Sequence, residues 1–190
     1  PDLVLDNYFG MGLHSLFHSD TEVECSGVKF NISNLTKMQS SSARTVESVF
    51  YVPAQRILSI SDGRPKNFME FDNTAPYVLR RFSETLRVFI QSGLGNPDTI
   101  FPMKNRLKGD VKRSISKSIF HTARVIIDQS TGQRKMVLDI DGMKLPFMTW
   151  SAGQKEFMPL LLALYCLTGP PTSVIDKVNY KWVIIEEPEM

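Results

Sequence analysis

The stretch Lys181-Trp-Val-Ile-Ile-Glu-Glu-Pro-Glu189 ends an apolar run in two adjacent carboxylates, Glu186 and Glu187. Such a run predicts a buried parallel strand, because strands of this kind are apolar on both faces. Ligands of parallel sheets gather beyond the carboxyl ends of the strands. We therefore expect the two carboxylates to lie at a ligand-binding edge of a central sheet. The alternative is a solvated strand end without function.

A second stretch, Thr149-Trp-Ser-Ala-Gly-Gln-Lys-Glu156, has the pattern of a helix start. The Ser151 hydroxyl can cap the helix and Gln154 can reach back to it, which is a capping box. The apolar run Phe157 to Leu167 follows and predicts a buried helix. Taken alone, this stretch indicates only a helix cap.

The order and spacing of the two stretches resemble the signature motif and Walker B strand of ABC-type ATPases. A Ser-Ala-Gly-Gln helix start is followed by a helix, the short loop Gly169-Pro-Pro171, four apolar residues and two glutamates. The run Glu-Glu-Pro-Glu resembles the end of the Walker B strand in the branch that contains SMC-like, RecF-like and OLD-family ATPases. It differs from the end of this strand in membrane transporters. The resemblance implies an α/β fold, a partial P-loop NTPase with a mixed central sheet, an antiparallel β sub-sheet and a helical lobe.

In this family the signature motif faces the γ-phosphate of ATP held by a second copy of the head. The resemblance implies that Ser151 donates its hydroxyl and that backbone N–H groups around Ala152, Gly153 and Gln154 bind phosphate oxygens. Lys155 would add a cation at the mouth of the site. Ala152 replaces the glycine that is more common in the family.

On the other half of the site, the resemblance implies that Glu186 holds Mg²⁺ as a hard oxygen ligand. Glu187 would orient or deprotonate the attacking water. Glu186 stands where an aspartate is usual, which we interpret as a feature of the OLD-like branch. ATP and Mg²⁺ are therefore the expected ligands.

The run Tyr51-Val-Pro-Ala-Gln-Arg56 follows a predicted strand that Pro53 ends. It resembles the Tyr-Ile-Pro-Ala-x-Arg of OLD-type ATPases. By this resemblance Gln55 is the glutamine of the Q-loop, which touches metal and water, and Arg56 lies near the nucleotide or at a domain junction. The alternative is that both are polar residues after a strand.

No Gly-x-x-x-x-Gly-Lys-Ser/Thr occurs in the sequence, so the chain has no loop of that type to cradle phosphates. We expect an internal piece of a longer ATPase, and we expect this chain alone to be inactive. A degenerate homologue that does not hydrolyse ATP is the alternative.

The composition is that of a globular protein. The 190 residues carry a net charge of +2, which is too small to indicate nucleic-acid binding without local clustering. The three histidines lack partners at metal-ligand spacing, and Cys25 and Cys166 fit reduced, buried thiols. No apolar run is long enough to span a membrane, so we expect no membrane association and a cytoplasmic location.

We expect one partial domain over residues 1–190, with a helical lobe at 74–120, followed at 121–190 by a β meander, the signature helix and the Walker B strand. Sequence patterns predict short helical turns in 1–20, a hairpin at Thr21–Ile32, a polar loop at Asn34–Arg44, a loop at Ser61–Asn73, a helix at Ala75–Ser92, a second helix at Met103–Phe120 and strands within Ala123–Phe147. The second helix carries six basic residues and one acid, which predicts either a solvated surface or one that contacts phosphates or a partner.

The function we expect is that of an ATP-hydrolysing head linked to DNA repair, recombination or anti-phage defence. Its partners would be a second copy of the head, in a homodimer or higher oligomer, and DNA or a nuclease domain. Two alternatives stay open: a non-catalytic dimerisation or interaction domain derived from an ATPase, and a transporter ATPase subunit. Glu-Glu-Pro-Glu argues against the transporter.

Overall fold

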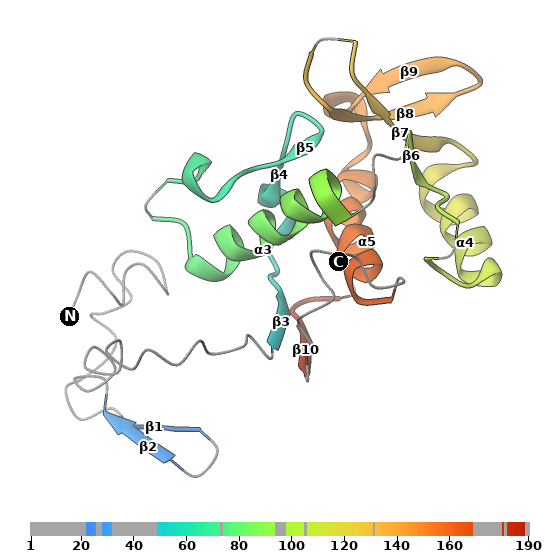
Figure 1. Cartoon of the computed structure of the whole chain (residues 1–190). Coiled ribbons are helices and arrows are strands. Elements are labelled where there is room, and N and C mark those ends of the chain that lie inside the picture. Colours follow the sequence, from blue (N-terminus) through green and yellow to red (C-terminus); the bar gives the residue numbers. More distant parts are fainter. Residues whose placement is uncertain are drawn as a thin grey trace.

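The computed structural model describes residues 22–25, 28–31, 49–72, 74–93, 98–104, 106–130, 132–168, 180 and 182–188. The fold is mixed α/β, with helices packed among several small sheets (Figure 1). The predicted turns in 1–20 and the predicted loop at Asn34–Arg44 lie outside the described residues. None of the described helices is long and apolar enough to cross a membrane.

The largest described sheet is an antiparallel meander in the order β6-β7-β8-β9. Its strands are β6 (Thr99–Phe101), β7 (Arg124–Asp128), β8 (Lys135–Ile140) and β9 (Met143–Pro146). Asp141 and Gly142 form the tight turn between β8 and β9 with positive φ values of 50° and 92°. The strands predicted within Ala123–Phe147 are confirmed. Strand β6 falls inside the segment expected to be a helical lobe.

A two-stranded hairpin of β4 (Ile60–Ser61) and β5 (Arg64–Pro65) is tied to the meander. The Met136 N–H donates to Gly63 O at 2.7 Å, and a Cβ on Gly63 would lie 2.6 Å from Met136 O. Only glycine fits this contact, since its φ is also +78°. The loop predicted at Ser61–Asn73 therefore contains this hairpin and the short 3₁₀ helix η4 (Phe68–Glu70).

Helix α3 (Tyr77–Val88) continues into one π turn, η5 (Phe89–Gly93), which agrees with the predicted helix at Ala75–Ser92. Leu79, Phe82 and Leu86 on its inner face are buried, as the helical spacing predicts. This face and α5 (Ala152–Thr168) share one core with the inner face of the meander. The short 3₁₀ helix η3 (Arg56–Ser59) contacts both α3 and α5.

The second helix begins later than predicted. Helix α4 (Gly109–Ile115) is followed by the π turn η6 (Ser116–Phe120), whereas the start was expected at Met103. Arg106 lies before the helix and is buried, with its Nη1 donating to Tyr165 O at 2.9 Å. One of the six basic residues predicted to lie on a surface is therefore buried in the core.

Strands β3 (Val49–Val52) and β10 (Trp182–Ile185) form a parallel pair, as predicted for the strand before the two glutamates. The predicted burial of β10 is wrong for the described residues, because Trp182, Val183 and Ile184 are 68%, 46% and 46% exposed. Within the described chain β10 pairs only with β3, so no other strand covers its second edge. The predicted mixed central sheet is not formed by the described strands either.

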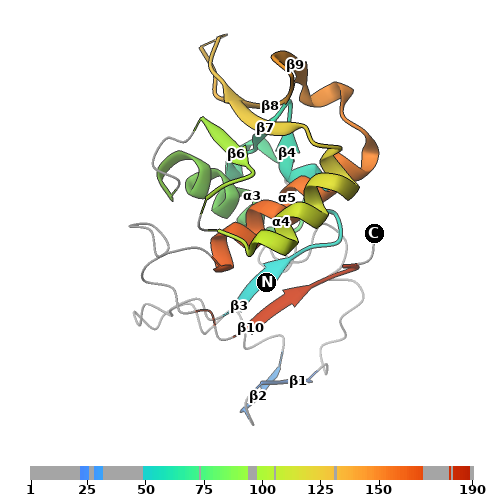
Figure 2. The same ribbon diagram turned by 90° about the vertical axis from the view of Figure 1, so that its right-hand side faces the viewer.

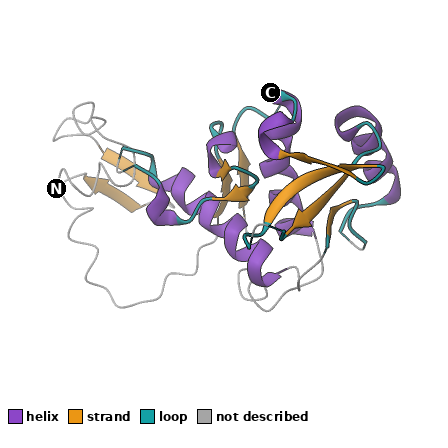
Figure 3. Cartoon of the chain, turned by 90° about the horizontal axis from the view of Figure 1, so that it is seen from above, coloured by secondary structure: helices purple, strands orange, loops and turns teal. Residues whose placement is uncertain are grey.

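The predicted hairpin at Thr21–Ile32 is confirmed by β1 (Glu22–Cys25) and β2 (Val28–Asn31), which pair antiparallel. In Figure 3 this hairpin lies at the opposite end of the molecule from the meander. Cys166 is a free, buried thiol on α5, and its burial raises its pKa to about 12.

Candidate functional site at the carboxyl ends of β3 and β10

The parallel pairing brings the carboxyl ends of β3 and β10 together. Val52 pairs with Ile185, and the next N–H, that of Glu186, donates to Val52 O at 3.0 Å. Gln55 follows β3 after Pro53 and Ala54, and its side chain is exposed. The register therefore places Gln55 and the two glutamates after strands that end at the same edge, as expected for a ligand site in a parallel sheet.

The Glu186 carboxylate is anchored to the neighbouring strand. Its Oε2 accepts a hydrogen bond from the Ala54 N–H at 3.0 Å. A hydrogen bond from the Tyr51 hydroxyl and then this amide bond lower the pKa of Glu186, because both stabilise the ionised form. In turn, burial and the Glu186 carboxylate raise the pKa of Tyr51 to about 12, so the phenol stays neutral and remains a donor.

Arg56 lies beneath the turn that follows β10. Its side chain is fully buried, with Nη1 donating to Glu186 O and Nη2 donating to Glu187 O, each at 3.0 Å. These bonds fix the backbone immediately after β10. The expectation that Arg56 lies near the nucleotide or at a domain junction stays a prediction.

This backbone turn leaves Glu187 exposed, in a left-handed conformation with φ of +44°. Non-glycine residues adopt such angles rarely and mainly where the surrounding structure holds them. Here the hydrogen bond from the buried Arg56 to Glu187 O supplies that support. The result is a free carboxylate on a fixed backbone, next to the anchored carboxylate of Glu186.

The pair of glutamates can serve a cation only together with other ligands. No group of three or more His, Cys, Asp or Glu side chains able to hold a metal occurs in the described part of the chain. Mg²⁺ is ordinarily held by one or two carboxylates together with water and substrate phosphates. An ionised, oriented Glu186 fits that donor set, since a carboxylate has about four acceptor positions.

The predicted signature segment forms a closed capping box at the start of α5. The Ser151 N–H donates to Gln154 Oε1 at 3.0 Å, and the Gln154 N–H donates to Ser151 Oγ at 3.2 Å. The Gln154 Nε2 also donates to Ile119 O, and the Lys155 ammonium donates to Met148 O at 2.8 Å. The predicted cap is confirmed, and the polar side chains have partners within the chain.

The backbone of this segment remains open to solvent. Ser151, Ala152 and Gly153 are exposed, and a Cβ on Gly153 would meet no atom within 4 Å. No packing inside the described chain therefore requires glycine at position 153. An approach by a group from outside would be compatible with this geometry.

The two segments have different neighbours in the chain. Helix α5, with 17 residues, is about 25 Å long. Its start lies toward β9 and the meander, whereas β3 and β10 lie on the other side of α3 and α5, between these helices and the hairpin of β1 and β2 (Figures 1 and 2). The hydrogen bonds bring Ala54, Arg56, Glu186 and Glu187 into contact, whereas side chains of the Ser151 segment donate to Ile119 O and Met148 O.

Sequence reasoning missed the contribution of Tyr51 and the clamping role of Arg56. Both contacts join residues at least 130 positions apart, so no local pattern indicates them. A tyrosine in a strand and an arginine after it are ordinary in sequence. Their role at the glutamates follows only from the pairing of β3 with β10.

Comparison of the chain with protein-family models, with curated proteins and with solved structures yields no match. The case for a function therefore rests on the residues and their arrangement.

Proposed function

We propose that this chain is part of an ABC-type ATPase head of the SMC/RecF/OLD-like branch, with a P-loop NTPase fold, that binds and hydrolyses ATP with Mg²⁺. The supporting observation is the parallel pairing of β3 with β10, which aligns the ends of the strands that precede Gln55 and the two glutamates. A Q-loop and a Walker B strand require this alignment. It depends on contacts that the sequence motifs do not encode locally.

In this proposal each residue at the strand ends has a separate task. Glu186, ionised and held by the Ala54 amide, would bind Mg²⁺, which supplies charge stabilisation to the phosphates when bound. Glu187, exposed on its fixed backbone, would accept a proton from the attacking water. Gln55 would orient that water, and Arg56 would hold the turn that carries both glutamates.

The other half of the site would come from a second copy of the chain. The N–H groups of the exposed Ala152 and Gly153 at the start of α5, with the positive end of the helix dipole, would bind the γ-phosphate of ATP on the partner head. Ser151, Ala152, Gly153, Gln154 and Lys155 form this surface. Among the described residues, no side-chain hydrogen bond joins this surface to the two glutamates, which fits a site shared between two copies.

A phosphate-binding loop would have to come from outside residues 1–190, since the chain has no such motif. The chain alone is therefore expected to lack tight Mg-ATP binding and hydrolysis. Isothermal calorimetry with Mg-ATP on the 190-residue chain tests this, and a submicromolar affinity would contradict it.

The closed capping box favours a second candidate, a non-catalytic dimerisation or interaction domain derived from an ATPase. Ser151 and Gln154 already satisfy one another, so a helix cap accounts for both residues without a phosphate. The turn that carries Glu186 and Glu187 favours the ATPase instead, because the capping box at Ser151 does not account for the buried Arg56 that holds this turn. A transporter ATPase is a weaker candidate, since its Walker B strand would usually end in Asp-Glu-Pro-Thr.

The process served by ATP hydrolysis would be DNA repair, recombination or anti-phage defence in the cytoplasm, with DNA or a nuclease domain as further partner. The exposed basic residues Lys108, Arg113 and Lys117 on and beside α4 offer one surface for such a partner. Their number is small, so the contact would be modest and sensitive to salt.

The deciding experiment compares two variants in the full gene product by sedimentation with and without ATP. Glu187→Gln keeps the size of the side chain and removes the base, so turnover should fall about 10²–10⁴-fold while ATP-bound dimers accumulate. Ser151→Arg should block dimerisation and leave nucleotide binding to each head intact. A monomeric Glu187→Gln protein in ATP, or a Ser151→Arg protein that dimerises and turns over normally, would refute the shared site.

A further inference from the structure

A polar pocket of about 430 Å³ lies between β5, η4, the end of α3 with η5, and the connection from β7 to β8. This volume is in the range of small-molecule sites, which is roughly 300–1,000 Å³. None of its lining residues belongs to the proposed ATP site. The lining consists of Arg64, Pro65, Asn67, Glu70, Arg87, Ile90, Gln91, Gln133 and Arg134.

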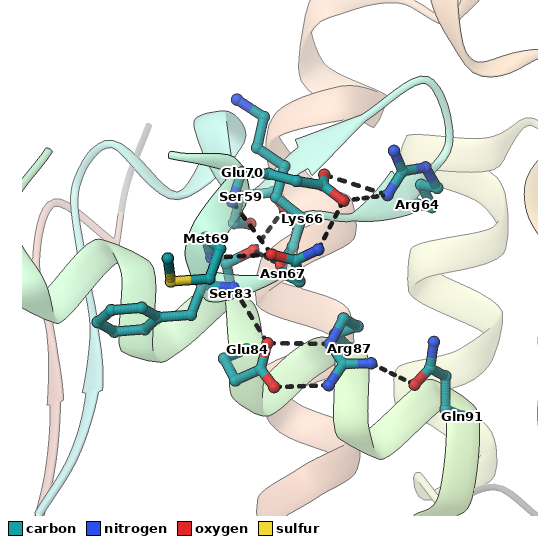
Figure 4. Close-up of polar contacts among 11 residues, drawn as sticks. Ser59, Arg64, Lys66, Asn67, Met69, Glu70, Ser83, Glu84, Arg87 and Gln91 are labelled. Atoms are coloured by element: carbon teal, nitrogen blue, oxygen red, sulfur yellow. Dashed lines mark hydrogen bonds and ion pairs between the residues drawn. The ribbon is translucent and has the colours of Figure 1, made fainter. Parts of the chain in front are cut away.

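One of its three arginines, Arg87, is held rigidly (Figure 4). Its Nε and Nη2 donate to the two oxygens of Glu84 at 2.9 and 2.6 Å, and its Nη1 donates to Gln91. These hydrogen bonds lower the pKa of Glu84 and raise that of Arg87, so both stay charged. Glu84 also accepts from the Phe68 N–H at 3.2 Å, which fixes the pair to η4.

A second arginine, Arg64, is held by Glu70. Its Nη1 lies 2.9 and 3.1 Å from the two carboxylate oxygens of Glu70. Asn67 donates to the same carboxylate at 2.9 Å, and its Oδ1 caps η4 by accepting from the Met69 and Glu70 N–H groups. This arginine is therefore also oriented by a carboxylate that is itself anchored (Figure 4).

The third arginine, Arg134, differs from the other two. Its Nε and Nη2 are buried and have no hydrogen-bond partner among the described residues. Within that part of the chain no carboxylate forms an ion pair with it either. Arg134 as a whole is half-buried, but two buried guanidinium nitrogens without acceptors are unfavourable, because buried polar groups in proteins are ordinarily hydrogen-bonded. The positive charge of this pocket that remains uncompensated is thus that of Arg134.

We propose that this pocket binds the phosphate group of a small phosphorylated ligand. Arginine matches phosphate well because its planar fork donates two parallel hydrogen bonds. A phosphate in the pocket would offer acceptors to Arg134 once its guanidinium turns toward the open space. The side-chain amides of Gln91 and Gln133 in the same lining supply further donors.

The lining favours a small ligand over a nucleic-acid strand. It contains no aromatic side chain on which a base could stack. The carboxylates of Glu70 and Glu84 stand beside the arginines and would repel the successive phosphates of a strand. A single phosphate next to Arg134 avoids both difficulties. This inference does not depend on the proposed ATP site.

The test titrates the full chain with inorganic phosphate and with pyrophosphate by calorimetry, without Mg²⁺ and at constant ionic strength in chloride. Wild type should bind with a saturable isotherm, and Arg134→Gln should weaken binding at least tenfold. Arg134→Lys, which keeps the charge and loses the fork, should fall between them. The control Lys29→Gln changes an exposed cation on β2, away from the pocket, and should bind as wild type does.

Equal binding by wild type and Arg134→Gln would overturn the proposal. So would an unphosphorylated single-stranded oligonucleotide that binds more tightly than pyrophosphate and loses its affinity in Arg134→Gln, because the pocket would then serve nucleic acid. Thermal unfolding in chloride checks that each variant is folded. If Arg134→Gln does not fold, the comparison of wild type with Arg134→Lys decides the question.

Discussion

The turn after β10 and the start of α5 are both polar and exposed, yet their contacts are organised differently. After β10, the groups that hold Glu186 and Glu187 come from Ala54 and Arg56, at least 130 positions away. At the start of α5, Ser151 and Gln154 hold one another across one helical turn. A capping box is a common feature of helix starts, so it says little about function. A fully buried arginine that donates to two carbonyl groups of one backbone turn requires more of the fold and is therefore the more informative feature.

The largest effect on stability should follow from Arg56→Met, which keeps the volume of the side chain and removes its two hydrogen bonds to the turn. We expect a loss of about 3 kcal/mol in the free energy of unfolding, since hydrogen bonds from charged donors contribute about 1.5–3 kcal/mol each. Urea denaturation measures it. Arg113→Met, at an exposed position, should change stability by no more than about 0.5 kcal/mol. Equal losses in the two variants would show that the turn does not depend on Arg56.

A smaller effect is expected at the helix start. Ser151→Ala removes one half of the capping box and should cost about 1 kcal/mol. Gly153→Ala should instead stabilise the chain by about 0.5 kcal/mol, because alanine favours a helix and its Cβ meets nothing here. Both are measured by thermal unfolding. A destabilising Gly153→Ala would mean that glycine serves the fold of the single chain and would weaken the case for an outside phosphate.

The smallest effect concerns acidity at the turn. Tyr51→Phe removes the main cause that lowers the pKa of Glu186, so this pKa should rise toward its ordinary value of 4.5. Because the folded pKa is depressed, the stabilisation from Glu186 is complete above about pH 4.5 and is lost as the pH falls through the folded value. In Tyr51→Phe, the free energy of unfolding should therefore decrease less as the pH is lowered through this range. Carbon-13 NMR titration of Glu186 measures the shift, and Tyr165→Phe on α5 should leave it unchanged.

Local patterns predicted the elements that local physics decides. The period of α3, the alternation in β7 and β8, the hairpin of β1 and β2, and the capping box at Ser151 were all predictable, since the residues involved lie within a few positions of one another. The parallel direction of β10 was also predicted, because its apolar run and its terminal carboxylates are typical of such strands.

The remaining features depend on which distant residues meet. Met103–Phe120 has the composition of a helix, but Arg106 is drawn into the core by Tyr165 O and α4 starts only at Gly109. The burial of β10 could not be predicted either, since it depends on neighbours that an isolated strand does not specify. Basic residues and apolar strands have several acceptable surroundings, and their sequence alone does not select one.

The sequence by itself determined the candidate site residues of this protein, which are two glutamates after an apolar strand, a glutamine after another strand, and a serine at a helix start. The tertiary structure alone decided that β10 pairs with β3, that Arg56 is buried beneath the glutamate turn, and that the buried Nε and Nη2 of Arg134 beside a pocket have no hydrogen-bond partner among the described residues. The physical reason is that helix caps and strand patterns arise from neighbouring residues, whereas burial and charge pairing are properties of the packed chain.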